Sequence, residues 1–152
     1  MKLYFLRHGK ADWPNWEKPD AERPLTKKGK KESRAVAKFL RKSEVAPKLI
    51  LSSPLPRAWE TAEITAKVLD AKLKEEAALK PGFGIREVTS ILQRAKNADL
   101  MIVGHEPDFS AVIAALTGAS LDLVKGGVAC VEMEGSGKGT LHWLVSPKLI
   151  IR

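Results

Sequence analysis

The stretch "LYFLRHGKAD", residues 3–12, joins four apolar residues directly to Arg7, His8 and Gly9. An apolar run without polar alternation is typical of a strand that is covered on both faces of a parallel sheet. In open α/β sheets, ligands bind just beyond the carboxyl ends of the strands. A cation and an imidazole at this point therefore predict a functional site at the end of a buried strand.

Two further stretches repeat this arrangement. "PKLILSSP" (residues 47–54) and "ADLMIVGHEP" (residues 98–107) are short apolar runs that end in polar residues. Each of the three runs is followed by a segment with helical spacing, and this alternation is typical of α/β proteins. We expect a three-layer α/β/α fold with a mostly parallel central sheet, helices on both faces, and one crevice where the three strand ends meet.

Four helices are predicted from apolar residues that recur every three or four positions. The second begins near Ser53 and Pro54, because serine caps helices and proline suits their first turn. After the fourth, "GGVACVEMEGSGKGTLHWLVSP" (residues 126–147) predicts two strands joined by a Gly-rich turn. The helices are expected at about Thr26–Lys42, from Ser53 to Leu69, at Ile85–Ala95 and from Glu106 to Leu116.

The size of the chain, 152 residues, predicts a single domain over residues 1–152. Hydrophobic residues make up 44% and charged residues 29%, and the apolar runs are short, so we expect neither a membrane partner nor broad disorder. The first apolar run is too short for an export signal, which predicts a cytoplasmic protein. Cys130 is the only cysteine and lies in an apolar stretch, so a buried core thiol is expected rather than a disulfide or a Cys-based metal site.

The net charge of +8 is concentrated in the first half of the chain. Residues 1–76 contain 18 basic and 11 acidic side chains, whereas residues 77–152 contain 8 and 7. A positive field suits an anionic partner, whether a phosphorylated substrate, an acidic protein or a nucleic acid. Charge alone does not choose among these.

Four side chains at the predicted crevice are of the types that phosphoryl transfer requires. A neutral imidazole at His8 can attack phosphorus, and nearby Arg7 and Arg57 disfavour its protonated form. Arginine can bind two phosphate oxygens at once, and His105 can donate to a third. This chemistry needs no metal and no cofactor.

Four ordered motifs carry a resemblance to a known family. "LRHGKAD", "RPLTKKG" (residues 23–29), "SSPLPRAWETA" (residues 52–62) and "VGHEP" (residues 103–107) resemble the successive motifs of the histidine phosphatase superfamily, and the spacing and length resemble its small SixA-type phosphohistidine phosphatases. The resemblance implies that His8 is the phosphorylated nucleophile and that Arg7, Arg57 and His105 complete the phosphate pocket. Within "RPLTKKG", Thr26 and Gly29 are interpreted as helix-start and packing positions.

The segment "DAKLKEEAALKPGFG" (residues 70–84) departs from larger members of the resembled family, in which an inserted cap supplies a carboxylate as general acid. It is short, which predicts that the cap is missing. The corresponding position, near Leu79-Lys80-Pro81, offers no carboxylate. The remaining candidates for a proton donor are Glu75, Glu76, Glu106 and Asp108.

An open pocket without a strong acid favours phosphohistidine on a protein as the substrate, because its imidazole can leave already protonated. The alternative within the superfamily is a small-molecule phosphomonoesterase. A mutase does not fit, since an open pocket admits water to the phosphorylated intermediate. The sequence leaves the oligomeric state open, with a monomer favoured.

A basic nucleic-acid-binding module is the rival from another class. The chain has no recognised binding motif and no aromatic platform among its basic residues, so no nucleic-acid partner is expected.

A series of cations recurs in steps of four and three along one predicted helical face, and we interpret it as a solvated face or as a docking stripe for an acidic phosphocarrier domain. Its members are Lys27, Lys31, Arg34, Lys38 and Arg41.

Three other aromatic side chains are candidates for the surroundings of the site. His142, in the predicted last strand, has no motif partner and is interpreted as structural. Trp13 and Trp16 follow the first motif, so they are expected either to border the pocket or to pack their own loop.

Overall fold

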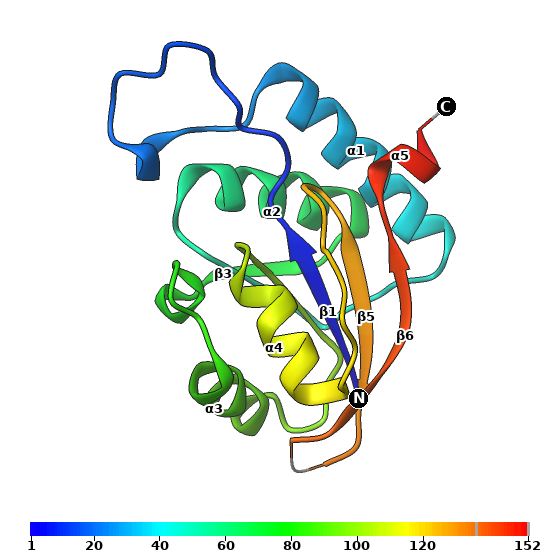
Figure 1. The fold of residues 1–152 in the computed structure, drawn as a ribbon. Coiled ribbons are helices and arrows are strands. Elements are labelled where there is room, and N and C mark those ends of the chain that lie inside the picture. Colours follow the sequence, from blue (N-terminus) through cyan, green and yellow to red (C-terminus); the bar gives the residue numbers. More distant parts are fainter. Residues whose placement is uncertain (136, 152) are drawn as a thin grey trace.

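A six-stranded mixed sheet forms the centre of the computed structural model, which describes residues 1–135 and 137–151 (Figure 1). The strand order is β3-β2-β4-β1-β5-β6; the first four strands in this order are parallel, and β5 and β6 pair antiparallel to their neighbours. The predicted three-layer fold with a mostly parallel sheet is confirmed. The strands are β1 (Lys2–Arg7), β2 (Leu49–Ser52), β3 (Lys72–Glu75), β4 (Leu100–Gly104), β5 (Val128–Met133) and β6 (Gly139–Val145).

Helices cover both faces of this sheet (Figure 1). On one face lie α1 (Lys27–Lys42), α2 (Pro56–Leu69) and the short α5 (Pro147–Ile150); on the other lie α3 (Ile85–Ala95) and α4 (Asp108–Thr117). Two 3-10 turns, η1 (Asp20–Glu22) and η2 (Ala77–Leu79), lie in the connections. The four predicted helices and the two predicted final strands are therefore present.

Alternate residues of β1 enter two separate hydrophobic cores. Leu3 and Phe5 pack with α3 and α4, whereas Tyr4 and Leu6 pack with α1 and α2. Because both faces are buried, the strand shows an unbroken apolar run instead of polar alternation. Cys130 of β5 is buried in the second core, as predicted.

The start of α2 differs from the expectation. Ser53 does not cap this helix; Leu55 precedes its first residue, Pro56, in an extended conformation. The residue before a proline is disfavoured in helical geometry, so the helix cannot begin before Pro56. Ser53 is left in the turn after β2, where its hydroxyl accepts a hydrogen bond from the backbone N–H of Leu55 at 3.3 Å.

Strand β3 and helix α5 gave no signal in the sequence. β3 is a four-residue edge strand, "KLKE", and only Leu73 of it is partly buried. A short charged edge strand has no apolar run to reveal it. The predicted Gly-rich turn between β5 and β6 includes Ser136, which lies outside the described residues.

Candidate active site

The carboxyl ends of three parallel strands meet at one edge of the sheet. Arg7 of β1 is paired with Gly104 of β4, and the backbone N–H of His8 donates to the carbonyl oxygen of Gly104 at 3.1 Å. The backbone N–H of Ser53, just after β2, donates to the carbonyl oxygen of Val103 at 3.0 Å. The residues that follow these strands are thus fixed beside one another by backbone hydrogen bonds.

His8 is a buried side chain in a fixed orientation. It is 7% exposed, and its ring centroid lies 5.4 Å from that of His105. Its Nδ1 lies 2.7 Å from the carbonyl oxygen of Gly9. Since a carbonyl can only accept, Nδ1 donates, and in the neutral imidazole Nε2 keeps its lone pair.

Burial is the main reason that His8 is neutral. Desolvation lowers the pKa of His8 to about 3, opposed by the hydrogen bond to Gly9 and reinforced by His105, Arg57 and Arg7 in that order. The two arginines, from which this effect was predicted, contribute less than burial. A buried neutral imidazole is a competent nucleophile at physiological pH.

Arg57 and Arg7 reach the site from α2 and β1. Arg57 is 6% exposed; its Nη1 donates to the carbonyl oxygen of Asp20 at 3.0 Å, and its Nη2 lies 3.5 Å from Asp20 Oδ2. Arg7 Nη1 donates to the carbonyl oxygen of Leu123 at 3.0 Å. The Nε atoms of both arginines are buried and have no hydrogen-bond partner within the described residues. Two such unsatisfied cationic donors are suited to an oxyanion.

His105 offers a third donor of this kind. It is buried, its Nε2 lies 2.8 Å from Ser53 Oγ, and its Nδ1 has no partner among the described residues. Burial lowers the pKa of His105 to about 4, with a further decrease from Arg57. When the Ser53 hydroxyl donates to Nε2 of the neutral ring, Nδ1 carries the proton and is a donor without a partner.

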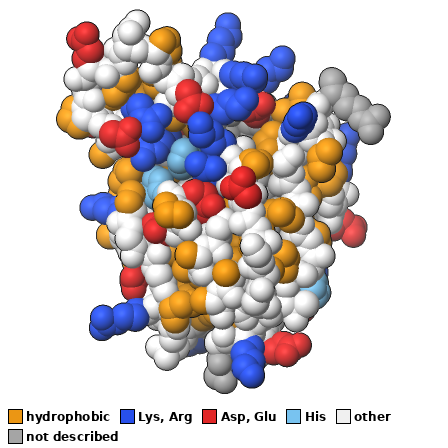
Figure 2. All heavy atoms as spheres, viewed as in Figure 1, with side chains coloured by type: hydrophobic (Ala, Val, Ile, Leu, Met, Phe, Trp, Pro, Cys, Tyr) orange, Lys and Arg blue, Asp and Glu red, His pale blue; other side chains and the backbone are white. Residues whose placement is uncertain are grey.

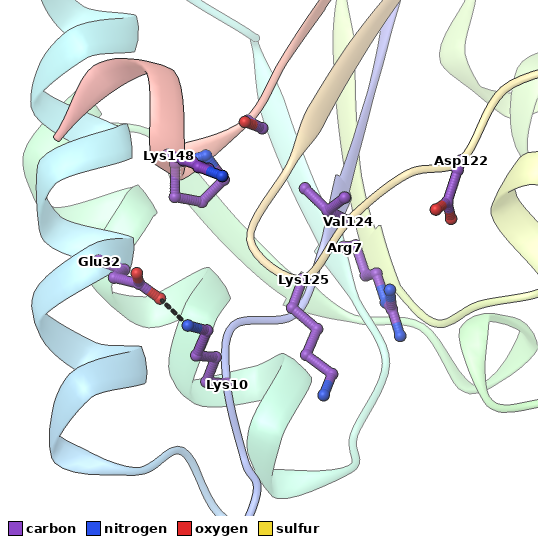
Figure 3. A pocket seen from close by; sticks show the side chains of 9 residues that line it. Arg7, Lys10, Glu32, Asp122, Val124, Lys125 and Lys148 are labelled. Atoms are coloured by element: carbon purple, nitrogen blue, oxygen red, sulfur yellow. Dashed lines mark ion pairs between the residues drawn. The ribbon is translucent and has the colours of Figure 1, made fainter.

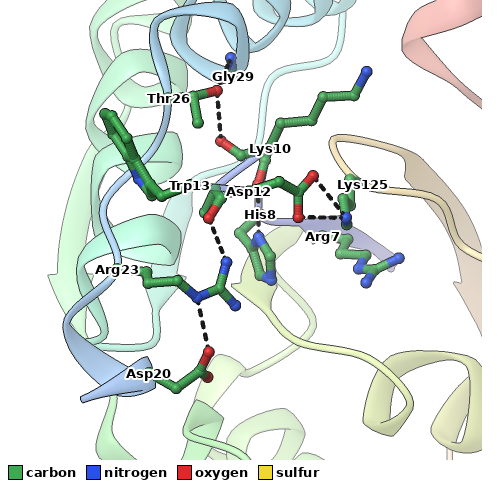
Figure 4. Close-up of polar contacts among 12 residues, drawn as sticks. Arg7, His8, Lys10, Asp12, Trp13, Asp20, Arg23, Thr26, Gly29 and Lys125 are labelled. Carbon is green, nitrogen blue, oxygen red and sulfur yellow. Dashed lines mark hydrogen bonds and ion pairs between the residues drawn. The ribbon is translucent and has the colours of Figure 1, made fainter. Parts of the chain in front are cut away.

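The loop after β1 adds two residues that the sequence argument missed. Arg23 Nε donates to Asp20 Oδ1 at 2.7 Å, and Arg23 Nη1 donates to the carbonyl oxygen of Ala11 (Figure 4). The hydrogen bond from Arg23 lowers the pKa of Asp20, so this carboxylate is charged beside Arg57. Because Arg23 belongs to the "RPLTKKG" motif, its place in the site could have been predicted from the sequence. No motif or periodicity indicates a role for Asp20.

The carboxylates considered as proton donors are engaged elsewhere, apart from Glu75, which lies on the edge strand β3 with no such contact among the described residues. Glu76 binds Arg94 at 2.6 Å. Glu106 accepts from the backbone N–H of Ser110 at 2.7 Å, and Asp108 Oδ2 accepts from that of Gly82 at 2.8 Å. Three of the four candidate carboxylates, Glu76, Glu106 and Asp108, therefore have structural roles.

Two hollows border the site. One of about 400 Å³ is lined by Arg7 together with Lys10, Lys125 and Lys148 (Figure 3). The other is lined by residues 12–16 with Lys18, Asp20 and Arg23. Lys and Arg side chains gather around histidine atoms at this end of the molecule (Figure 2).

Trp13 and Trp16 pack their own loop and line the hollow that contains Asp20 and Arg23, which does not include Arg7, His8, Arg57 or His105. Their indole N–H groups donate within their own loop, to the carbonyl oxygens of Pro24 at 2.8 Å and Pro19 at 3.1 Å. His142 lies exposed on β6, outside the group around His8.

Within the described residues, no group of three or more His, Cys, Asp or Glu side chains is arranged to bind a metal ion. Over residues 1–135 and 137–151, no helix has the length and apolarity needed to cross a membrane.

Comparison with known proteins identifies the family of the chain. The sequence model of the histidine phosphatase superfamily (branch 1) matches residues 3–87. The chain belongs to this superfamily. It is 30% identical to phosphohistidine phosphatase SixA of Escherichia coli (strain K12) over 154 residues, which cover 97% of this chain and 94% of that protein. It is also 34% identical to an uncharacterized protein of Picosynechococcus sp., over 99% of both chains.

Solved structures place the chain in the same family. The structure of the protein histidine phosphatase SixA complexed with tungstate matches with a TM-score of 0.89 and 29% identity, over 98% of this chain and 99% of that one. The alpha-ribazole phosphatase of Shigella flexneri, at 18% identity and a TM-score of 0.80, shares the fold. The chain is therefore a SixA-like member of the superfamily with the fold of phosphatases.

Proposed function

We propose that this protein removes phosphate from phosphohistidine on another protein through a covalent phospho-His8 intermediate. The observation that carries this proposal is the contact of His8 Nδ1 with the carbonyl oxygen of Gly9, which leaves Nε2 as the nucleophile. Nε2 bonds to phosphorus while the P–N bond of the substrate breaks, and the substrate imidazole leaves with the bonding pair. Water then attacks phosphorus, the bond to Nε2 breaks, and phosphate and neutral His8 are released.

The pocket stabilises the charge of the transferred phosphoryl group. Arg7 and Arg57 present buried Nε donors, and His105 presents Nδ1; all three lack a partner among the described residues. Donors that are already oriented where charge develops provide much of the catalysis in phosphoryl transfer. In this proposal Arg7, Arg57 and His105 bind the phosphoryl oxygens in the ground state and in the transition state, and no metal takes part.

The leaving group is the reason for preferring phosphohistidine to a phosphate ester. An alkoxide needs a proton as it leaves, whereas an imidazole can leave already protonated. Glu76, Glu106 and Asp108 are engaged in structural contacts, and residues 70–84 form only β3, η2 and a short connection. A single domain without a cap, as we propose, leaves room for a side chain on the surface of another protein.

The relatives support this choice of substrate. The similar E. coli protein is named a phosphohistidine phosphatase, and it matches nearly the whole chain. Such a likeness favours the same substrate class here over a small phosphate monoester.

A kinetic comparison tests the proposal. We expect kcat/KM in the presence of a metal chelator to be much higher for a phosphohistidine peptide than for an aryl phosphate. Faster hydrolysis of the aryl phosphate would favour a small-molecule phosphomonoesterase and would require a general acid near the pocket. Loss of activity with chelator, restored by a metal, would reject the metal-independent mechanism.

A further inference from the structure

The hollow beside Arg7 is a basic cleft with an apolar floor. Its volume is about 400 Å³, and Val124, which is 40% exposed, and Pro147 form its apolar part. Its polar lining consists of Arg7, Lys10, Lys125, Lys148, Glu32, Asp122 and Ser146 (Figure 3). Because Arg7 also belongs to the phosphate pocket, the cleft begins where the reacting group would lie.

The cations of this cleft are only partly neutralised. Lys125 Nζ lies 2.8 Å from Asp12, and Lys10 Nζ lies 3.8 Å from Glu32. Lys148 is exposed and makes no ion pair within the part of the chain that the structure describes. The lining carries four cations and two carboxylates, so it attracts anions.

The cleft continues along helix α1. Glu32 borders it and also borders a different hollow along α1, of about 570 Å³, whose basic lining is Lys27, Lys28, Lys31 and Arg34. Three of these, Lys27, Lys31 and Arg34, belong to the basic series singled out in the sequence, all of which is exposed. We call the cations that line these two neighbouring hollows, apart from Arg7, the basic band: Lys10, Lys125, Lys148, Lys27, Lys28, Lys31 and Arg34.

We propose that the basic band docks acidic side chains that flank the phosphohistidine of a protein substrate, while Val124 contacts an apolar neighbour of that residue. This inference rests on the proposed function and names the chemistry of its partner. An apolar centre within a polar rim is typical of protein interfaces. Single-stranded nucleic acid instead needs aromatic side chains for base stacking, and no Phe, Tyr or Trp lines the cleft beside Arg7 or the hollow along α1. Trp13 and Trp16 line the separate hollow beside Asp20 and Arg23.

Charge complementarity of this kind acts mainly on encounter and partner choice. Exposed ion pairs are individually weak, so two or three of them together give a preference of about tenfold for an acidic partner. Salt screens such contacts, with a Debye length of about 10 Å at 0.1 M ionic strength. The preference should therefore shrink steadily as salt is added.

The experiment uses three synthetic phosphohistidine peptides that differ only in flanking Glu, Gln or Lys residues. We expect wild-type kcat/KM to be about tenfold higher for the Glu peptide than for the Gln peptide, and lowest for the Lys peptide. Lys148→Glu and Lys31→Glu should each reduce the Glu-to-Gln preference by about threefold. Lys138→Glu, the same change at an exposed position between β5 and β6, is the matched control. It should leave the Glu-to-Gln preference unchanged.

The outcomes separate this inference from the proposed function. Equal turnover of the three peptides, or equal effects of Lys148→Glu and Lys138→Glu, overturns the docking role while the phosphatase stands. Failure to hydrolyse any phosphohistidine peptide, with turnover of an aryl phosphate, overturns the proposed function and the docking role with it. Salt-dependent binding of a single-stranded oligonucleotide that displaces the Glu peptide and is lost in Lys148→Glu assigns the band to nucleic acid instead.

Discussion

The Nδ1 atom of His8 lies 2.7 Å from the carbonyl oxygen of Gly9, and this contact determines which nitrogen of the ring is available for reaction. A Cβ on Gly9 would lie 2.8 Å from Ser33 Oγ and 3.2 Å from the carbonyl oxygen of Gly29. Gly9 thus lets the backbone approach α1 closely and present its carbonyl oxygen to the imidazole. The Gly of "RHG" is required by packing as much as by chemistry.

Replacing His8, the proposed nucleophile, should abolish turnover without unfolding the protein. In His8→Ala we expect no hydrolysis of a phosphohistidine peptide and an unchanged circular dichroism spectrum. Wild-type protein, quenched without acid during turnover, should show a phosphorylated form by intact mass spectrometry that His8→Ala lacks. His142→Ala is the control, since His142 is exposed on β6 and should retain full activity. A fully active His8→Ala variant would overturn the mechanism.

Acid should destabilise the protein partly through His8. Its pKa is lowered from 6.5 to about 3 in the folded protein, so below pH 6.5 the unfolded state binds more protons than the folded state. The free energy of unfolding therefore falls as pH falls from 6.5 toward about 3 and is unaffected by His8 above that range. Between pH 7 and about pH 4.5 this amounts to about 2 kcal/mol.

Urea denaturation of His8→Asn at the two pH values measures this contribution. The variant should lose less stability on acidification than the wild type, and His142→Asn should lose as much as the wild type. Equal losses in His8→Asn and the wild type would mean that His8 is protonated in the folded protein at acidic pH.

Arg57 should be irreplaceable by lysine. Its Nη atoms contact Asp20, and its buried Nε has no partner among the described residues. In the proposed mechanism Nε donates to a phosphoryl oxygen, and lysine cannot make all of these contacts together. We expect Arg57→Lys to lower kcat/KM by about 100-fold. Inorganic phosphate should also inhibit the variant less strongly. Arg86→Lys, at an exposed position of α3, should change neither value; a loss of less than threefold in Arg57→Lys would exclude Arg57 from the pocket.

Close packing between α1 and the loop after β1 should make Gly29 essential for stability. A Cβ on Gly29 would lie 2.2 Å from the carbonyl oxygen of Lys10, a backbone atom that also accepts from the N–H of Thr26 at 2.9 Å. We expect Gly29→Ala to lower the free energy of unfolding by about 2 kcal/mol. Lys28→Ala, at an exposed position in the same turn, should be close to neutral in urea denaturation. A neutral Gly29→Ala would show that the loop can move away from α1.

Much of the fold could be predicted because buried positions give the sequence a recognisable pattern of apolar residues. The apolar runs of β1, β2 and β4 arise because both faces of the sheet are covered, and the spacing in α1 to α4 arises because each helix covers one face. Strand β3 escaped prediction because it is a charged edge strand whose pairing depends on backbone hydrogen bonds to β2. Ser53 was misplaced as a helix cap because the effect of Pro56 on Leu55 is a backbone constraint that outweighs a capping preference.

The candidate site was predicted from the ends of the strands, which explains which of its residues the sequence could bring together and which it could not. Arg7, His8 and His105 lie at or after the ends of β1 and β4, and the topology brings such residues together. Asp20 and Arg23 lie in a long loop whose path no periodicity specifies, so only the structure places Asp20 against Arg57.

We expect the carboxylate of Asp20 to compete with phosphate for Arg57. Its Oδ2 lies 3.5 Å from Arg57 Nη2, while its backbone carbonyl oxygen separately accepts from Arg57 Nη1 at 3.0 Å. Asp20→Asn removes the charge but keeps the backbone contact, so Arg57 should remain in position with a free cationic edge. We expect inorganic phosphate to inhibit Asp20→Asn about threefold more strongly than the wild type. Asp70→Asn, which removes a charge at the opposite end of α2, is the matched control and should leave the inhibition constant unchanged. Weaker inhibition of Asp20→Asn would contradict competition and would mean that the carboxylate positions Arg57 for phosphate.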